Sequence, residues 1–410
     1  MLLTSSSLDL LDVFHHVRGM TDRLAAGLSA EDQTAQSMPD ASPTKWHRAH
    51  TSWFFEEFVL EGTDYEVFDP TYRYLFNSYY EAVGPRHPRP QRGLVTRPSA
   101  ADIGLFRGHV TEAVVDRLSS GSLDERHIGL AELGCHHEQQ HQELILMDAK
   151  HLLSTHPFDP VYVARVVEPD RAAPALSWRS VGGGLVEIGH DARGFAFDNE
   201  GPRHLAQVEP FEIAERAVTN ADWIAFIADG GYQRPDLWLS DGWGRVQAEQ
   251  WTAPAYWRND DGGWTTFTLS GRRPVRGGEP VCHVSFYEAD AYARWAGARL
   301  PTEQEWEVAA AAVDGRRGQL LDPDRCHPSI AGAAMIGDVW EWTASAYLPY
   351  PGFRPEGGAV GEYNGKFMCD QHVLRGASCA TPAGHERLTY RNFFPAHARW
   401  AFSGLRLARS

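Results

Sequence analysis

The most constraining feature of this chain is a helix-like stretch, residues 124–154, that carries eight consecutive polar residues in its middle. The string HHEQQHQE at 136–143 holds three histidines, two glutamates and three glutamines. Helical residues four apart share a face, with Cβ atoms about 6 Å apart, so His137 and His141 can hold one metal ion. Glu143 lies roughly 200° around the helix from His141 and is a poor third ligand. The string therefore predicts a metal site completed from another helix, and the alternative is a solvated polar face.

A second pair of histidines lies upstream, in the string WHRAHTSWFFEE. His47 and His50 are three residues apart and therefore occupy neighbouring faces of a helix. Their spacing leaves open which of them is the ligand. Imidazole suits zinc, copper, iron and nickel, so the residue type does not choose the metal. Three histidines would leave coordination positions open for water, dioxygen or substrate, whereas the alternative is a set of hydrogen-bonded core residues.

The first half of the chain is predicted to be helical. Apolar residues recur at three- and four-residue steps in four stretches: 8–27, 42–62, 101–119 and 124–154. Ser42 and Pro43 are expected to be the N-cap and the first residue of the second helix. Four long helices are typical of a bundle. A long loop with four prolines, 77–98, follows the second helix, and loops of this length are usually functional or disordered.

The composition changes beyond residue 160. Twelve of the 19 histidines lie before residue 160, whereas 12 of the 14 tryptophans lie after residue 175. Strand-like runs are predicted at 182–190, 203–215 and 280–286, and amphipathic helices at 219–229 and 285–297. The sequence therefore predicts an α+β chain with a helical domain (1–160), a linker (161–177) and an irregular α+β domain (178–410).

Charge and cysteine content narrow the possible partners and compartments. A formal net charge of −16 disfavours nucleic acid or an anionic membrane as a partner. The chain contains no run of 18 apolar residues, so no transmembrane helix is expected. The first residues lack the pattern of a signal peptide. The five cysteines, an odd number without a CxxC pair, indicate reduced thiols and a cytoplasmic protein. They are Cys135, Cys282, Cys326, Cys369 and Cys379.

Several long strings resemble a known enzyme family. HHEQQHQELILMDAKHLL and TKWHRAHTSWFFE resemble the DinB-like four-helix bundle of EgtB-type sulfoxide synthases, which act in ergothioneine biosynthesis. The strings PVCHVSFYEADAYARWAGARLPTEQEWEVAA, GDVWEWTASAY and VLRGASCAT resemble the formylglycine-generating-enzyme domain, a variant of the C-type lectin fold. The resemblance spans essentially the whole chain, with both domains in the order of that family.

This resemblance implies a mononuclear non-haem Fe(II) enzyme that uses dioxygen. The family joins a thiol to the imidazole C2 of hercynine (trimethyl-histidine) and oxidises the sulfur to a sulfoxide. Carried over to this chain, the iron ligands are His50, His137 and His141, and His47 is demoted. The family differs from the 2-His-1-carboxylate triad of other non-haem iron oxygenases.

The resemblance also implies residues that contact the substrate. Gln140 matches a glutamine that approaches hercynine, and Asn392 and Phe393 match residues that line its pocket. An aromatic face suits the trimethylammonium group, although core packing is the alternative for Phe393 and Phe394. Tyr79 and Tyr80 in the string SYYE are the expected proton donors. Tyr350 is a second candidate.

The thiol donor is predicted from departures within the family. The branch that uses γ-glutamylcysteine has an aspartate at the position of Phe394, so this chain looks like the branch that uses free cysteine. Arg86 and Arg89 are then expected to anchor the donor carboxylate, and the alternative for both is a solvated basic loop.

Three alternative functions remain open from the sequence. Selenoneine synthases are close relatives that join a selenosugar to hercynine. A zinc-bound, DinB-like thiol transferase fused to a lectin-like module would use no dioxygen. Formylglycine generation is the third alternative. It needs a copper-binding cysteine pair near the carboxyl end, and Cys369 and Cys379 are ten residues apart and lie outside the sequence context of that pair.

Overall fold

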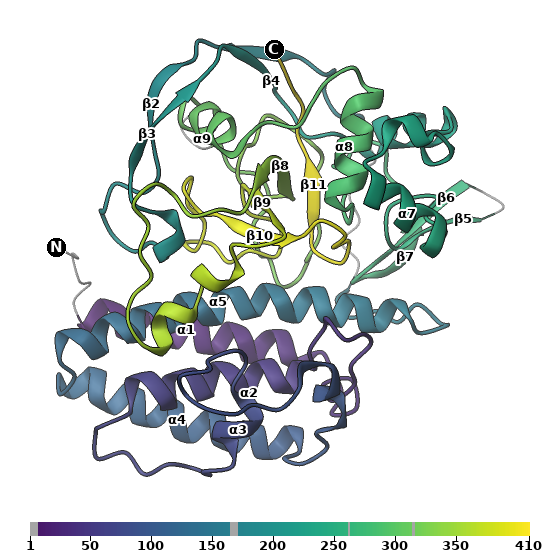
Figure 1. Cartoon of the computed structure of the whole chain (residues 1–410). Coiled ribbons are helices and arrows are strands. Elements are labelled where there is room, and N and C mark those ends of the chain that lie inside the picture. Colours follow the sequence, from purple (N-terminus) through teal and green to yellow (C-terminus); the bar gives the residue numbers. More distant parts are fainter. Residues whose placement is uncertain (1–6, 165–170, 261–262, 314–315) are drawn as a thin grey trace. The chain divides into compact units, whose positions relative to one another are not determined.

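The structure is a computed structural model that describes residues 7–164, 171–260, 263–313 and 316–410 (Figure 1). Its contacts divide the chain into two compact units. The helical unit consists of Met1–Phe158, Ala192–Phe195 and Pro355–Tyr363. The mixed unit consists of Asp159–Asp191, Ala196–Arg354 and Asn364–Ser410. Two short segments from beyond residue 190 therefore belong to the helical unit.

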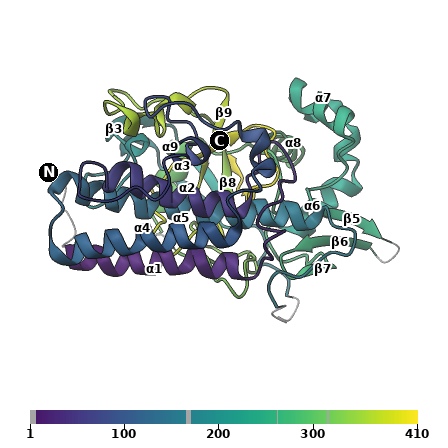
Figure 2. The same ribbon diagram turned by 90° about the horizontal axis from the view of Figure 1, so that it is seen from below.

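The helical unit is built on the four long helices that the periodicity predicts. They are α1 (Ser7–Ala26), α2 (Thr44–Phe54), α4 (Ala100–Ser120) and α5 (Glu125–Ser154). Helices α4 and α5 each pack against both α1 and α2 (Figures 1 and 2). A π-helix, η1 (Phe55–Val59), continues α2. The short helix α3 (Tyr72–Phe76) precedes the predicted loop 77–98, and the 3₁₀ helix η2 (Arg89–Leu94) lies within it. The DinB-like identity of this unit stays a prediction.

The start of α2 differs from the expectation by one residue. Pro43 is the N-cap, in an extended conformation, and the helix begins at Thr44. The backbone N–H of Ser42 donates to Asp148 Oδ2 at 2.7 Å, and its hydroxyl accepts from Arg92 Nη1 at 2.9 Å. Ser42 does not cap the helix because both of its polar groups bind these buried partners.

A buried charge cluster ties the four long helices together. The Glu138 carboxylate on α5 is fully buried and accepts from Arg18 Nη1 of α1 at 2.9 Å and from Arg107 Nη2 of α4 at 2.5 Å. Arg18 Nη2 also donates to Ser52 Oγ of α2 at 3.0 Å. Burial favours the neutral acid, but Arg107 and Arg18 outweigh it and lower the pKa of Glu138 to about 2. The cluster therefore holds a charged glutamate beside His137.

The mixed unit contains short strands in small sheets, and its α+β class confirms the expectation. The strands are β1 (Trp178–Val181), β2 (Gly184–Ile188), β3 (His204–Val208), β4 (Phe211–Ala214), β5 (Trp257–Asp260), β6 (Gly263–Thr268), β7 (Gly271–Pro274), β8 (Trp340–Ala346), β9 (Gln371–Arg375), β10 (Asn392–Pro395), β11 (Ser403–Leu405) and β12 (Ala408–Arg409). Their orders are β1-β4-β12, β10-β9-β8-β11, β2-β3 and β5-β6-β7. Only the pairing of β8 with β11 is parallel among the described strands.

The helices of the mixed unit agree with the two predicted ones and add others. They are α6 (Asn220–Ala228), α7 (Ser240–Glu249), α8 (Phe286–Trp295) and α9 (Glu303–Ala311), with short 3₁₀ turns at Asp198–Glu200, Gly231–Gln233, Pro235–Leu237, Ala359–Glu362 and Gly365–Phe367. The 3₁₀ turn Ala359–Glu362 lies in the part that folds with the helical unit. Side-chain capping boxes begin α6, α8 and α9.

The predicted strand at 280–286 is wrong. Pro280 forms only an isolated bridge with Thr219, and His283 has a φ of 67°, in the left-handed region. A strand needs extended backbone at each residue, so an apolar run interrupted in this way cannot join a ladder. Residues 165–170 of the predicted linker lie outside the described residues, and the predicted domain boundaries stay a prediction. In the described part of the chain, no helix is long and apolar enough to cross a membrane.

We predict that Glu138→Gln destabilises the protein by about 3–5 kcal/mol, because Arg18 loses its buried counter-charge and Arg107 keeps only the half-exposed Asp22. Urea unfolding followed by the helical circular dichroism signal measures the loss. Glu112 is exposed on α4, so Glu112→Gln is a matched control with an expected change within about 0.5 kcal/mol. Equal stability of the two variants would contradict the structural role of the cluster.

The same cluster predicts an acid-sensitive helical unit. The ordinary pKa of glutamate is 4.5, and the folded pKa of Glu138 is about 2. The unfolded state therefore binds the proton more readily, so the stabilisation is complete above about pH 4.5 and is lost as the pH falls towards 2. Urea midpoints measured between pH 7 and pH 3 should fall more steeply for the native protein than for Glu138→Gln.

Candidate metal centre

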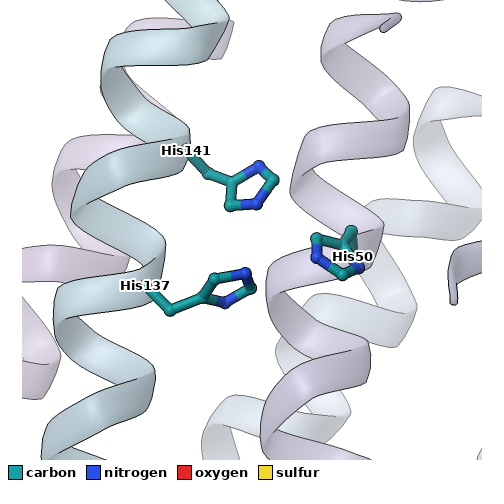
Figure 3. A group of neighbouring side chains, drawn as sticks. All are labelled: His50, His137 and His141. Atoms are coloured by element: carbon teal, nitrogen blue, oxygen red, sulfur yellow. The ribbon is translucent and has the colours of Figure 1, made fainter. Parts of the chain in front are cut away.

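Three buried histidines of the helical unit point toward one another (Figure 3). His50 comes from α2, and His137 and His141 come from successive turns of α5. One candidate ligand atom from each lies within 4.8 Å of the other two. The side chains are at most 8% exposed, and their ring centroids are 4.6–4.9 Å apart. The structure thus brings together the three histidines that the resemblance implies as ligands.

The hydrogen bonds of these rings leave nitrogen atoms available for a metal. His50 Nδ1 lies 2.7 Å from the carbonyl oxygen of Phe76, and its buried Nε2 has no partner among the described residues. His141 Nδ1 lies 2.8 Å from His47 Nδ1, which leaves its Nε2. Neither nitrogen of His137 has a partner in the described part of the chain. Buried polar atoms rarely stay unpaired, so three converging imidazoles fit a bound cation.

Burial keeps these histidines neutral. It is the largest cause that lowers the pKa of His137 to about 3, and it also holds the pKa values of His50 and His141 well below the ordinary 6.5. The neighbouring histidines act in the same direction on His50 and His141. A neutral imidazole offers a lone pair, so the set suits a divalent metal of the first transition row.

The other polar residues of HHEQQHQE are not a solvated face. Glu138, Gln139, Gln142 and Glu143 are all buried. Gln142 Nε2 donates to the carbonyl oxygen of Val17 at 2.8 Å, which helps to bind α5 to α1. His136 stacks on Phe195, with ring centroids 3.7 Å apart, and is not one of the three clustered histidines. The interpretation of this string as a solvated face is therefore wrong.

Tyr79 and Tyr80 belong to a group of packed aromatic rings that reaches His50 through Trp53. Their rings stack with centroids 4.6 Å apart, and Tyr80 is fully buried against Trp53 at 5.5 Å. Trp53 in turn stacks on His50 at 5.4 Å. Burial first, and the nearby phenols next, raise the pKa of Tyr80 well above 10. Tyr80 therefore keeps its proton at neutral pH.

A tyrosine that the sequence analysis missed lies next to the histidines. Tyr363 ends the segment Pro355–Tyr363, and its ring centroid is 5.6 Å from that of His137 and 6.5 Å from that of Tyr79. Its hydroxyl donates to Gln140 Oε1. The only sequence signal was its place ten residues before the string VLRGASCAT, which carries the family resemblance but does not single out the tyrosine.

The segment that carries Tyr363 is fixed to the loop that carries the tyrosine pair. The Glu362 carboxylate accepts from the backbone N–H of Glu81 at 3.0 Å and of Ala82 at 2.8 Å. These two residues directly follow Tyr80. Tyr79, Tyr80 and Tyr363 are thus held as one group by a side chain from far along the sequence.

The predicted donor anchors lie at the surface of the same loop. Arg86 pairs with Glu81, and Arg89 donates to the carbonyl oxygen of Asp40. Arg92, which the sequence analysis missed, is buried with its guanidinium 3.3 Å from the ring centroid of Trp46. Trp46 stacks on His50 with centroids 4.7 Å apart. Arg92 therefore supports the outer face of an indole that packs on the site.

Comparison with known proteins places the chain in a family. Residues 163–323 and 324–410 match the sulfatase-modifying factor enzyme 1-like domain. The hercynine oxygenase of Mycolicibacterium smegmatis is 34% identical over 409 residues, which cover 91% of this chain and 92% of that protein. The hercynine oxygenase of Mycobacterium tuberculosis is also 34% identical, over 90% of this chain and 91% of that protein.

The chain belongs to the hercynine oxygenase family. The predicted family and its oxidative enzyme class are thereby confirmed. The formylglycine-generating enzyme of Streptomyces coelicolor is 32% identical over 52% of this chain and 83% of that protein. Its match covers only part of the chain, whereas the matches to hercynine oxygenases span nearly all of it.

The remaining predicted residues of this hercynine oxygenase homologue lie in the mixed unit. Asn392, Phe393 and Phe394 are half-buried on β10. Phe393 stacks on Tyr347 with centroids 4.1 Å apart, and Phe394 meets Trp400 edge to face at 5.9 Å. Tyr350 is buried, and its hydroxyl donates to Glu303 Oε2 at 3.2 Å. An ion-pair network in the mixed unit thus engages Tyr350.

We predict that alanine at His50, His137 or His141 abolishes stoichiometric Fe(II) binding by the purified protein, because two imidazoles cannot hold the ion as three do. His136→Ala is the matched control within the same string and should retain the metal. Metal content after anaerobic loading and desalting measures both. Equal loss in all four variants would show that the assigned helix face is wrong.

Proposed function

We propose that this protein joins the thiol of cysteine to the imidazole C2 of hercynine and oxidises the sulfur to a sulfoxide. The C2–H and S–H bonds break, while a C–S and an S–O bond form. Dioxygen takes up four electrons, one of its oxygens enters the sulfoxide, and the other leaves as water. The printed names of the relatives supply hercynine. The observation that carries the proposal is the buried set of three neutral histidines.

We propose Fe(II) as the metal of this set, with His50, His137 and His141 as its ligands. A bound ferrous ion would supply open coordination positions and the electron transfer that dioxygen chemistry requires. Apolar side chains around the three histidines exclude water from the metal position. Trp46 and Trp53 both stack on His50, and the ring centroids of Phe54 and His137 are 4.5 Å apart. A water-poor site strengthens the electrostatic interactions inside it.

Three tyrosines are the proposed source of the proton for reduced oxygen. Tyr363 has the geometry that favours it, because its ring lies beside His137 and its hydroxyl is already oriented by Gln140. Tyr79 and Tyr80 complete the group, with Tyr79 between Tyr80 and Tyr363. A general acid must lie within hydrogen-bond reach of the atom that it protonates. We therefore place Tyr363 first, and Tyr79 and Tyr80 behind it.

The substrate contacts are proposed in the same terms. Gln140 orients hercynine through its amide, and Asn392 with Phe393 and Phe394 takes the amino-acid end with its trimethylammonium group. Aromatic faces attract such a cation, with a gain of about 0.5–2 kcal/mol per contact. Arg86 and Arg89 anchor the carboxylate of cysteine. The present pairing of Arg86 with Glu81 is a surface ion pair, which is worth at most about 1 kcal/mol and is readily exchanged.

The domain plan and compartment complete the proposal. Residues 1–160 carry the iron ligands, 161–177 link, and 178–410 form the domain that resembles formylglycine-generating enzymes. We also propose the cytoplasm as the compartment, where reducing conditions suit five cysteines that form no disulfide in the described part of the chain.

To test the function, the protein is first loaded with Fe(II) under anaerobic conditions. It is then mixed with hercynine, dioxygen and either cysteine or a selenosugar. We expect hercynine-dependent oxygen uptake and a product with the mass of the cysteine–hercynine sulfoxide. A product from the selenosugar alone would assign selenoneine synthesis instead. Zinc-loaded protein that turns over a thiol without oxygen uptake would favour a thiol transferase.

We predict that Tyr363→Phe shifts the product from sulfoxide toward cysteine sulfinate, because the phenyl ring keeps the packing but removes the proton. Tyr79→Phe and Tyr80→Phe, measured in parallel, show which of the three donates. Tyr65→Phe is the control, since Tyr65 binds Glu56 outside this group. An unchanged ratio of sulfoxide to sulfinate in all three variants would contradict a tyrosine donor.

A further inference from the structure

A line of hydrogen bonds leads from His141 into the protein core. His141 Nδ1 lies 2.8 Å from His47 Nδ1, and His47 Nε2 lies 3.0 Å from Asp148 Oδ2. His47 is 2% exposed and Asp148 is 5% exposed. His47 lies on α2 and Asp148 lies on α5, two turns beyond His141. The sequence resemblance demotes His47 as a ligand, but the structure places it directly behind one.

The donors and acceptors of this line fix where the protons lie. Asp148 Oδ2 already accepts the backbone N–H of Ser42 at 2.7 Å, so it serves as an acceptor. A neutral His47 must then carry its proton on Nε2, and its Nδ1 offers a lone pair. The proton between the two Nδ1 atoms therefore belongs to His141. His141 is left with a lone pair on Nε2, the nitrogen that is free of this line.

We propose that His47 and Asp148 are positioning residues that hold His141 in its Nδ1–H tautomer and so present its Nε2 lone pair to the metal. The proposal rests on the proposed function, because it takes the three histidines as the metal ligands. The backbone carbonyl of Phe76 plays the same positioning role for His50, whose Nδ1 lies within hydrogen-bond distance of it. Ligating histidines generally donate their second N–H to a fixed acceptor, which is here a second imidazole backed by a carboxylate.

A merely structural role for His47 would have a different signature. As a core residue it would contribute to the free energy of unfolding, and its replacement would leave the metal affinity of the folded protein unchanged. As a positioning residue it sets that affinity, and any side chain with an acceptor toward His141 and a donor toward Asp148 can replace it. Glutamine has both groups, whereas phenylalanine keeps a ring but has neither.

The test compares His47→Phe with His47→Gln in the full-length protein. We expect His47→Phe to weaken Co(II) binding by about 10–100-fold and His47→Gln to recover most of the affinity. Competition with a chelator gives the dissociation constant, and the visible spectrum of bound Co(II) reports its coordination. His151→Ala is the matched control. That histidine lies one turn beyond Asp148 and ten residues beyond His141 on α5, and its Nδ1 bonds to Ser37 Oγ.

Asp148 provides a second, independent pair of variants. Asp148→Asn can keep a carbonyl oxygen where both donors point and should bind Co(II) within about threefold of the native protein. Asp148→Ala removes the acceptor and should weaken binding as His47→Phe does. Thermal unfolding of the metal-free proteins shows which variants fold. If His47→Phe does not fold, the comparison of Asp148→Ala with Asp148→Asn tests the positioning role.

The outcomes separate this proposal from the proposed function. Native-like Co(II) affinity in folded His47→Phe and Asp148→Ala would overturn the positioning role, as would equal weakening by His47→Gln and His47→Phe. The metal site would still stand if His137→Ala abolished binding in the same assay. Native protein that binds neither Co(II) nor Fe(II) would overturn both. Metal binding without hercynine-dependent oxygen uptake would remove the function and leave the positioning role intact.

Discussion

The charge cluster of Arg18, Glu138 and Arg107 is the constraint on which the helical unit depends. A fully buried carboxylate is tolerable only when its charge is matched and its oxygens are bonded, and here each oxygen receives a guanidinium N–H from a different helix. Ser52 adds α2 to the same cluster. A slip of any helix by one residue would break a buried charged contact. The cluster thereby fixes the rotation of α5 beside His137, and of α2 two residues beyond His50.

Around the histidines, the physical environment changes from charged to aromatic within a few residues. The set itself carries no charge, because burial depresses its pKa values, and indole and phenyl rings cover it. Each fixed ring takes its orientation from a group one layer further out: Phe76 for His50, and His47 with Asp148 for His141. Hydrogen bonds to buried acceptors thus orient two of the three rings, whereas His137 is held by packing against Phe54 and Tyr363.

The sequence predicted what is local and missed what depends on distant contacts. Periodicity placed the four long helices within a few residues when the π-helix that continues α2 is included, and the four-residue spacing of His137 and His141 put both on one face. The apolar run at 280–286 misled because its pattern does not reveal the left-handed backbone of His283. Ser42 resembles an N-cap in the sequence, but in the structure its backbone N–H binds Asp148 and its hydroxyl binds Arg92, and both partners are distant in sequence. Tyr363 and Arg92 lie in no periodic pattern, so only the fold shows that they belong to the site.

The attachment of Pro355–Tyr363 to the helical unit also sets an order in time. During synthesis the three histidines are complete once His141 has left the ribosome, but Tyr363 follows more than 200 residues later, roughly 10–45 s at typical rates of elongation. For that interval the nascent helical unit lacks the segment that carries the phenol beside His137. The phenol beside His137 thus belongs to the last part of the helical unit to be synthesised, and the bonds of Glu362 to the backbone N–H groups of Glu81 and Ala82 can form only then.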